Sequence, residues 1–275
     1  MPTTLALLLL LLSLAIAAAA AKSHDYYHPL ALNDHLLRHR ARAGGRHRSR
    51  GAGRHIPYLN CLSWRLGVEA NNIRDWPMVP RLCEGYIRHY MLGRQYRDDC
   101  TAVAAAAIRY ATTVELVHDG KDVWVFDIDE TALSNLPYYG RVDVGFGIRR
   151  CNETNFEAWI RDANAPVMQE TLRLYNSVRA LGMKPVFISG TKEQFRSARI
   201  SNLHRAGFRA WEKLILRGVN DTERPMVEYK SEKRAELVAR GYRIVGNIGD
   251  QWSDLLGEHV GLRTFKMPDP MYYVN

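Results

Sequence analysis

The chain of 275 residues is long enough for one or two domains with a substantial hydrophobic core. Hydrophobic residues make up 47% of it and charged residues 24%, which is typical of a globular protein and excludes a disordered or fibrous chain. The net charge of +9 does not by itself indicate nucleic-acid binding, because residues 22–55 hold eight Lys and Arg against two Asp and so supply +6 of it.

The first 21 residues are predicted to be a signal peptide. An apolar run from Leu5 to Ala17 is followed by small residues through Ala21, which suits cleavage just before Lys22. No Lys or Arg precedes the run, and its length approaches that of a bilayer span, so a retained anchor is the alternative. We expect cleavage and delivery to the extracellular space or the vacuole, with no membrane association and no nucleic-acid binding of the mature protein.

Residues 22–57 are predicted to form a basic, flexible linker. The stretch is rich in Arg and contains six of the ten His of the chain. The alternative is that it contacts a polyanion, such as nucleic acid or the cell wall, or a membrane surface.

Residues 58–120 are predicted to be a helical region that packs on the core. Good helix formers run from Val79 to Ala111. Aromatic residues recur within this run at Tyr86, Tyr90 and Tyr96, and we interpret this stripe as core packing rather than as a ligand site.

Cysteines and glycosylation motifs fit an exported protein. None of the four cysteines is spaced as a metal site or a redox pair, so we expect two disulfides, with three pairings open and free buried thiols as the alternative. The cysteines are Cys61, Cys83, Cys100 and Cys151. The motifs Asn152-Glu153-Thr154 and Asn220-Asp221-Thr222 predict glycosylation at Asn152 and Asn220.

From Lys121 onward, short apolar runs alternate with helical segments. The apolar runs are 123–126, 185–188, 213–216 and 243–248, with a fifth at 264–265. The helical segments are 167–181, 191–206 and 230–240. This alternation predicts an α/β fold with a central parallel sheet, in which ligands bind beyond the carboxyl ends of the strands.

Polar residues follow these predicted strands. Asp127 and Asp129 come directly after the first run and would project to the same side of an extended segment, where they repel unless a cation or a shared proton compensates. A hard divalent ion such as Mg²⁺ suits oxygen ligands of this kind. Capping of a following helix is the alternative use of these aspartates.

Three further segments offer groups that suit a phosphate. Ser189-Gly190-Thr191 ends the second run and can donate hydroxyl and backbone hydrogen bonds, or simply cap a helix. Lys230 is predicted to open a helix, where a lysine needs a nearby anion unless it is exposed. Asp250 ends the fourth run and would share a helix face with Asp254, or act as a plain cap. The order and position of these segments together favour one shared site.

The combination resembles a known family. The segments Asp127-Ile128-Asp129-Glu130-Thr131, Ser189, Lys230 and Gly249-Asp250 with Asp254 follow the four-part pattern of haloacid-dehalogenase-like (HAD) phosphatases. The chain is more closely similar to plant class B acid phosphatases, the group that includes vegetative storage proteins. That resemblance covers residues 58–275 and rests also on Cys61-x-Ser63-Trp64-Arg65, Glu69-x-Asn71-Asn72 and Pro268-x-Pro270-x-Tyr272-Tyr273. The region 22–57 has no counterpart in it.

The resemblance implies a fold and a role for each residue. It implies a Rossmann-like HAD core at 121–275, with a small cap at about 138–166 and an N-terminal helical segment. Asp127 would be the nucleophile, and Asp129 the general acid and base. Thr131, Ser189, Gly190 and Lys230 would bind the substrate. Mg²⁺ would be held by Asp127, Asp129 through its backbone carbonyl, and Asp250, with Asp254 in the outer shell.

The resemblance also implies a substrate class and an assembly. We expect a secreted or vacuolar acid phosphatase that hydrolyses small phosphomonoesters, and a homodimer. The alternative is a vegetative storage glycoprotein with minor phosphatase activity. Some storage-type members lack the nucleophilic Asp, and because Asp127 is present here we expect activity. Phe146, Phe156 and Trp159 either line an aromatic entrance or, as we prefer, pack the cap.

Overall fold

A five-stranded, all-parallel sheet organises the computed structural model, which describes residues 59–221 and 223–274. Its strands are β1 (Asp122–Phe126), β2 (Lys184–Lys192), β3 (Lys213–Arg217), β4 (Arg243–Gly249) and β5 (Arg263–Lys266). They lie in the order β3-β2-β1-β4-β5. The chain adds β2 and β3 on one side of β1 and then β4 and β5 on the other, so the strand order reverses between the neighbouring strands β1 and β4. The predicted α/β fold with a central parallel sheet is confirmed.

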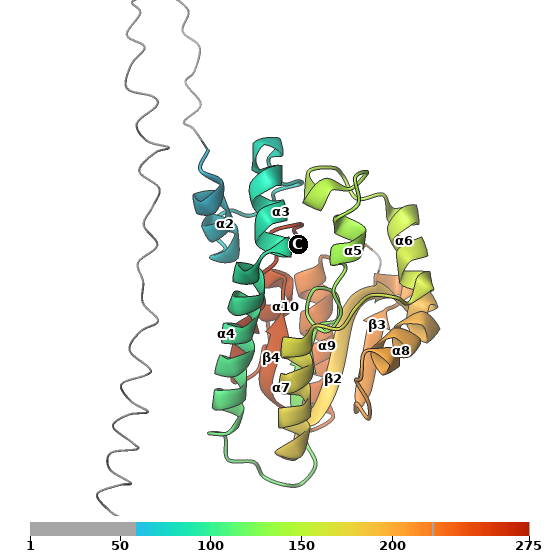
Figure 1. The fold of residues 1–275 in the computed structure, drawn as a ribbon. Coiled ribbons are helices and arrows are strands. Elements are labelled where there is room, and N and C mark those ends of the chain that lie inside the picture. Colours follow the sequence, from blue (N-terminus) through green and yellow to red (C-terminus); the bar gives the residue numbers. More distant parts are fainter. Residues whose placement is uncertain (1–58, 222, 275) are drawn as a thin grey trace, which may run out of the picture. The chain divides into compact units, whose positions relative to one another are not determined.

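Helices cover both faces of this sheet. The α-helices are α2 (Cys61–Glu69), α3 (Glu84–Leu92), α4 (Arg94–Ala111), α5 (Leu136–Tyr139), α6 (Glu153–Asp162), α7 (Gln169–Ala180), α8 (Arg196–Arg205), α9 (Met226–Ala239) and α10 (Trp252–Leu255). Short 3₁₀ turns are η2 (Arg81–Cys83), η3 (Gly145–Gly147), η4 (Glu193–Phe195) and η5 (Val219–Asp221). Helices α4 and α7 lie side by side on one face, while α9 and α10 pack on the other (Figure 1).

Successive side chains along a strand belong to hydrophobic clusters on opposite faces of the sheet. In β1, Trp124 and Phe126 join the cluster on the α4 and α7 side, whereas Val123 and Val125 join the cluster that contains Tyr229 of α9. A strand buried on both faces reads as a continuous apolar run, which is why 123–126 was recognisable in the sequence.

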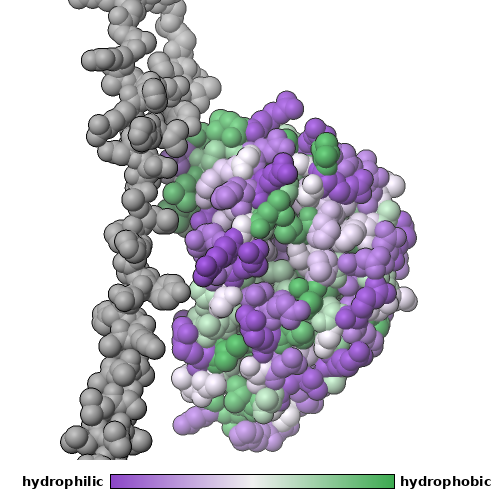
Figure 2. Space-filling view, in the orientation of Figure 1, coloured by the Kyte–Doolittle hydropathy of each residue, from purple (hydrophilic) through white to green (hydrophobic). Residues whose placement is uncertain are grey.

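The N-terminal helices are tied to the sheet by polar contacts as well as by packing. Lys266 of β5 donates to Glu69 of α2 at 2.8 Å. Trp64 of α2 is buried, whereas Leu62 and Leu66 are exposed, and Figure 2 shows hydrophobic surface over this helix. Across residues 59–221 and 223–274, helices lack the combination of length and hydrophobicity that crossing a membrane requires. The predicted signal peptide and the whole of the predicted linker lie outside the described residues.

The predicted start of one helix was wrong. Lys230 was expected to open a helix, but α9 begins at Met226, directly after Pro225 at the N-cap. Proline is well suited to the start of a helix, because it has no N–H for the helix to leave unpaired. Lys230 therefore lies in the second turn, where α9 approaches the ends of the strands.

The expectation of two disulfides was also wrong. Cys61 and Cys83 are bonded, but Cys100 is buried and free within α4, and Cys151 is free and exposed after η3. A side chain inside the core and one on the surface cannot meet without rearrangement of the backbone. The single bond joins α2 to the turn that precedes α3.

Removal of this disulfide should destabilise the fold. The bond closes a loop with a sequence separation of 22, and a loop of that size restricts the unfolded chain by about 3 kcal/mol. We expect a double Cys61→Ser, Cys83→Ser variant to lose about that much free energy of unfolding in urea titrations. Cys151→Ser is the matched control and should leave the unfolding midpoint unchanged. Equal midpoints for the double variant and the native chain would contradict the expectation.

Candidate active site

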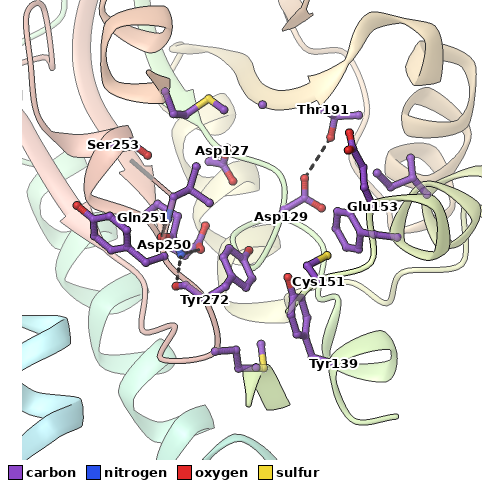
Figure 3. Close-up of a pocket in the computed structure, with 18 of the residues that line it drawn as sticks. Asp127, Asp129, Tyr139, Cys151, Glu153, Thr191, Asp250, Gln251, Ser253 and Tyr272 are labelled. Carbon is purple, nitrogen blue, oxygen red and sulfur yellow. Dashed lines mark hydrogen bonds between the residues drawn. The ribbon is translucent and has the colours of Figure 1, made fainter. Parts of the chain in front are cut away.

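A pocket of about 500 Å³ opens where β1, β2 and β4 end (Figure 3). Its wall includes Asp127 and Asp129 after β1, Gly190 and Thr191 at the end of β2, and Asp250 after β4. This is the edge at which the strand order reverses, the usual ligand position in open parallel sheets. The fold therefore brings these segments together around one pocket.

The backbone turns sharply directly after β1. Asp127 still donates its N–H to the Ile248 carbonyl of β4 at 3.0 Å, so it lies in register with the sheet. Glu130 then adopts a left-handed conformation with φ +52°, which is uncommon for a residue other than glycine. Asp127 and Asp129 were expected to project to the same side of an extended segment. That segment ends early, and the two carboxylates have different partners.

Asp127 is paired with Lys230. Lys230 Nζ donates to Asp127 Oδ1 at 2.6 Å and also to Asp254 Oδ1, and all three side chains are buried. Asp254 additionally accepts the backbone N–H of Gln251 at 2.9 Å. Lys230 is thus held between two acids, one on the sheet edge and one on α10.

Asp250 completes a group of three carboxylates. Ligand atoms of Asp127, Asp250 and Asp254 all lie within 4.8 Å of one another. Thr131 is fully buried and donates to Asp250 Oδ1 at 3.1 Å, so its hydroxyl contacts this acid, and Thr131 does not line the pocket. Three carboxylates and the single ammonium of Lys230 leave a formal charge of −2, which matches one divalent cation.

Burial makes this group of acids unfavourable without an added cation. Desolvation raises the pKa of Asp127 well above its usual value; Lys230 opposes the shift, whereas Asp254 and Asp250 add to it. Desolvation, with Asp269 and Asp254 nearby, likewise raises the pKa of Asp250. Burial alone would lower the pKa of Lys230, but its two acid partners outweigh burial and raise it. The site therefore holds more acid than Lys230 compensates.

Glycines at two strand ends leave room for these contacts. A Cβ atom at Gly249 would lie 2.3 Å from Asp254 Oδ2, and one at Gly190 would lie 2.7 Å from the Met226 methyl carbon. Ser189 is fully buried and does not line the pocket; its hydroxyl accepts the Thr191 N–H at 3.1 Å. The backbone at Gly190, rather than a side chain, thus faces the pocket.

Asp129 pairs with an arginine that the sequence interpretation missed. Arg199 Nη2 donates to both carboxylate oxygens of Asp129, at 2.6 and 2.7 Å. Asn135 Nδ2 donates to the same carboxylate at 2.8 Å. Thr191 Oγ1 also donates to it, at 3.2 Å (Figure 3). The repulsion expected between Asp127 and Asp129 is thus relieved by two separate side-chain cations. Arg199 stood within a predicted helix without any distinguishing local motif.

The C-terminal segment forms another wall of the pocket. Gln251 Nε2 donates to Asp250 at 2.7 Å and to Asp269 at 3.1 Å, while Gln251 Oε1 accepts the N–H of Val274 at 3.0 Å. Tyr272 stacks on Tyr139 with ring centroids 5.0 Å apart. The Pro268-x-Pro270-x-Tyr272-Tyr273 motif therefore closes the site beside Asp250.

Aromatic side chains of the predicted cap have divided roles. Phe156 of α6 lines the pocket, whereas Phe146 is buried outside it. Trp159 Nε1 donates to Asn135 Oδ1 at 2.8 Å and so supports the residue that contacts Asp129. The predicted glycosylation sites Asn152 and Asn220 are both exposed.

Comparisons with known proteins identify relatives. The family model described as HAD superfamily, subfamily IIIB (Acid phosphatase) matches residues 47–275. The chain is 45% identical over 216 residues to "Acid phosphatase 1" of Solanum lycopersicum, covering 78% of this chain and 84% of that protein. It is 46% identical to "Stem 28 kDa glycoprotein" of Glycine max, covering 79% and 85%. It is 40% identical to "Vegetative storage protein 2" of Arabidopsis thaliana, covering 80% and 82%.

Solved structures give the same fold. The class C acid phosphatase from Bacillus anthracis superposes with a TM-score of 0.56 at 21% identity, covering 68% of this chain and 83% of that one. At this identity the likeness concerns the fold alone.

Binding of a divalent cation should stabilise the protein through Asp250. Because a cation that fits among the three carboxylates binds the folded state, MgCl₂ should raise the melting temperature over that in EDTA, increasingly with concentration. The Asp250→Asn variant should lose this shift. Asp143→Asn, which removes an exposed acid paired with Arg141, is the matched control and should keep it. An equal shift in Asp250→Asn would contradict a cation site at this position.

Proposed function

The chain belongs to the acid phosphatases of HAD superfamily subfamily IIIB, and on this basis we propose that Asp127 attacks phosphate monoesters and carries the phosphoryl group. The observation that carries the proposal is the pairing of Asp127 with Lys230 inside a pocket at the switch point of the sheet. The ionised form of the Asp127 carboxylate, which Lys230 and a bound cation favour, is a competent nucleophile, and the ammonium is placed for the charge on the phosphoryl oxygens.

In the first step an Asp127 carboxylate oxygen forms a bond to phosphorus while the bond from phosphorus to the leaving oxygen breaks. Asp129 gives its proton to that leaving oxygen, which departs as the alcohol. Gly190 and Lys230, which line the pocket, bind the transferring group. Ser189 acts on it through Thr191, which its hydroxyl contacts, and Thr131 acts on it through Asp250.

In the second step water attacks phosphorus and releases Asp127. Asp129, now a carboxylate, accepts a proton from that water, so both protons and charge balance over the cycle. Two steps through a covalent intermediate divide one large barrier, which matters because phosphomonoester hydrolysis is among the slowest uncatalysed reactions known.

Acid phosphatases of this family depend on a metal ion, and the group of three buried carboxylates fits one. We propose Mg²⁺, held by Asp127, Asp250 and the backbone carbonyl of Asp129. When bound, it supplies positive charge to the phosphoryl oxygens. Asp254 already holds Lys230 and the N–H of Gln251, which supports an outer-shell role for it.

Small phosphomonoesters are the substrate class that the family implies, and residues of about 138–166 would form the cap that admits them. Phe156 and the stacked pair Tyr139–Tyr272 support a leaving group with an apolar or aromatic surface. We further propose export to the extracellular space or vacuole with glycans at Asn152 and Asn220, and assembly as a homodimer. The relatives named as stem glycoproteins support glycosylation.

A storage role is the second candidate function, because relatives at 40% identity are named vegetative storage proteins. Storage needs no active site. In this chain, however, Lys230 contacts Asp127, and ligand atoms of Asp127 and Asp250 lie within 4.8 Å of each other. The retained site favours catalysis as the main function.

Replacement of Asp127 tests the proposal directly. The Asp127→Asn variant keeps the volume of the side chain but loses the nucleophilic charge, so hydrolysis of p-nitrophenyl phosphate at acidic pH should fall to background. Near-ultraviolet circular dichroism should show a folded variant. Activity of the native chain should also fall on chelation and return with MgCl₂. Turnover retained by a folded Asp127→Asn variant would place the nucleophile elsewhere.

A further inference from the structure

The Asp129 carboxylate is bound more extensively than a freely moving acid would be. Its Oδ1 accepts from Arg199 and Asn135, and its Oδ2 accepts from Arg199 and Thr191. The side chain nevertheless remains about one-fifth exposed and lines the pocket. Asp129 is therefore fixed from behind while it still faces the substrate space.

Arg199, which pairs with Asp129, is a buried side chain with few other polar contacts. It comes from the first turns of α8, and its side chain is 1% exposed. Its Nε donates to Thr191 Oγ1 at 3.0 Å, and Asp129 is its ion-pair partner within the described part of the chain. A buried guanidinium is costly unless it is paired, so its position depends on Asp129.

Thr191 connects this pair to the phosphate-binding segment. Its hydroxyl accepts from Arg199 Nε and from Ser189 Oγ, at 3.0 and 3.1 Å, and donates its own proton to Asp129 Oδ2. The orientation of Asp129 is thus linked through one hydroxyl to Ser189 at the end of β2.

We propose that Arg199 is a positioning residue that holds Asp129 toward the leaving group and stabilises its carboxylate as the proton departs. The inference rests on the proposed role of Asp129 as the general acid. Negative charge develops on Asp129 while the proton moves to the leaving oxygen, and the fixed guanidinium favours that charge in the transition state more than it favours the neutral acid. No new bond to Arg199 forms in either step.

Leaving-group chemistry separates this role from a purely structural one. A good leaving group such as p-nitrophenolate departs with little help from an acid, whereas the alkoxide of an alkyl phosphate needs its proton. In Arg199→Met, kcat/KM should therefore fall at least about tenfold more for glycerol 2-phosphate than for p-nitrophenyl phosphate. Arg199→Lys restores a charge without the planar fork and should recover part of this selective loss.

Two further variants complete the test. Asp129→Asn should show the same selective loss, and Asp129→Asn combined with Arg199→Met should be no worse than Asp129→Asn alone, because the two residues act as one unit. Arg196→Met is the matched control: it removes an arginine from the same helix that pairs with Glu193 at the surface, and it should leave both rates unchanged.

Equal losses on both substrates in Arg199→Met, or additive losses in the double variant, would overturn the inference. Should Arg199→Met unfold, Arg199→Lys decides alone, since an equal loss on both substrates in that variant also overturns it. A failed role of Arg199 leaves Asp127→Asn inactive, whereas activity in Asp127→Asn would remove the proposed function itself. The two failures are therefore distinguishable.

Discussion

The burial of more negative than positive charge at one edge of a parallel sheet is the constraint on which the rest of this structure depends. Asp127, Asp250 and Asp254 are each 6% exposed or less, and Lys230 is the ammonium that lies among them. Buried carboxylates are costly unless paired, so the fold has to bring a matching charge to this position. The formal deficit of two charges is the physical reason to expect a divalent cation here.

Parallel topology makes this concentration of charge achievable. Asp127 and Asp250 follow neighbouring strands, and Lys230 reaches them from α9, which packs under the same sheet. The reversal of strand order between β1 and β4 leaves the space that the pocket occupies. Asp129 turns toward β2 and α8 instead, where Arg199 compensates it. Asp127 and Asp129 are only two residues apart, but they lie in separate electrostatic environments, which suits a nucleophile and a proton donor.

Much of this arrangement could be predicted because short-range signals encode it. The run 123–126 is apolar on both faces of its strand, and Asp127 and Asp250 directly follow strands, so order along the chain was enough to group them. Other features depend on long-range contacts. Arg199 is 70 residues from Asp129, Asn135 is recognisable only from the turn around Glu130, and Gln251 acquires its partners from the C-terminal segment. The start of α9 follows from Pro225, which favours the first position of a helix, whereas the prediction began the helix at Lys230. The cysteine pairing could not be predicted, because it depends on which cysteines are buried, and the spacing along the chain does not show this.

The most direct measurement of the central claim is a crystal structure grown with Mg²⁺ and beryllium fluoride, which mimics a phosphoryl group on a carboxylate. Convergence of the acids on one ion predicts beryllium on an Asp127 oxygen, with a single cation shared by Asp127 and Asp250 and with Lys230 against the fluorides. A fluoride complex bound away from Asp127, or a cation that contacts Asp250 without Asp127, would contradict the account.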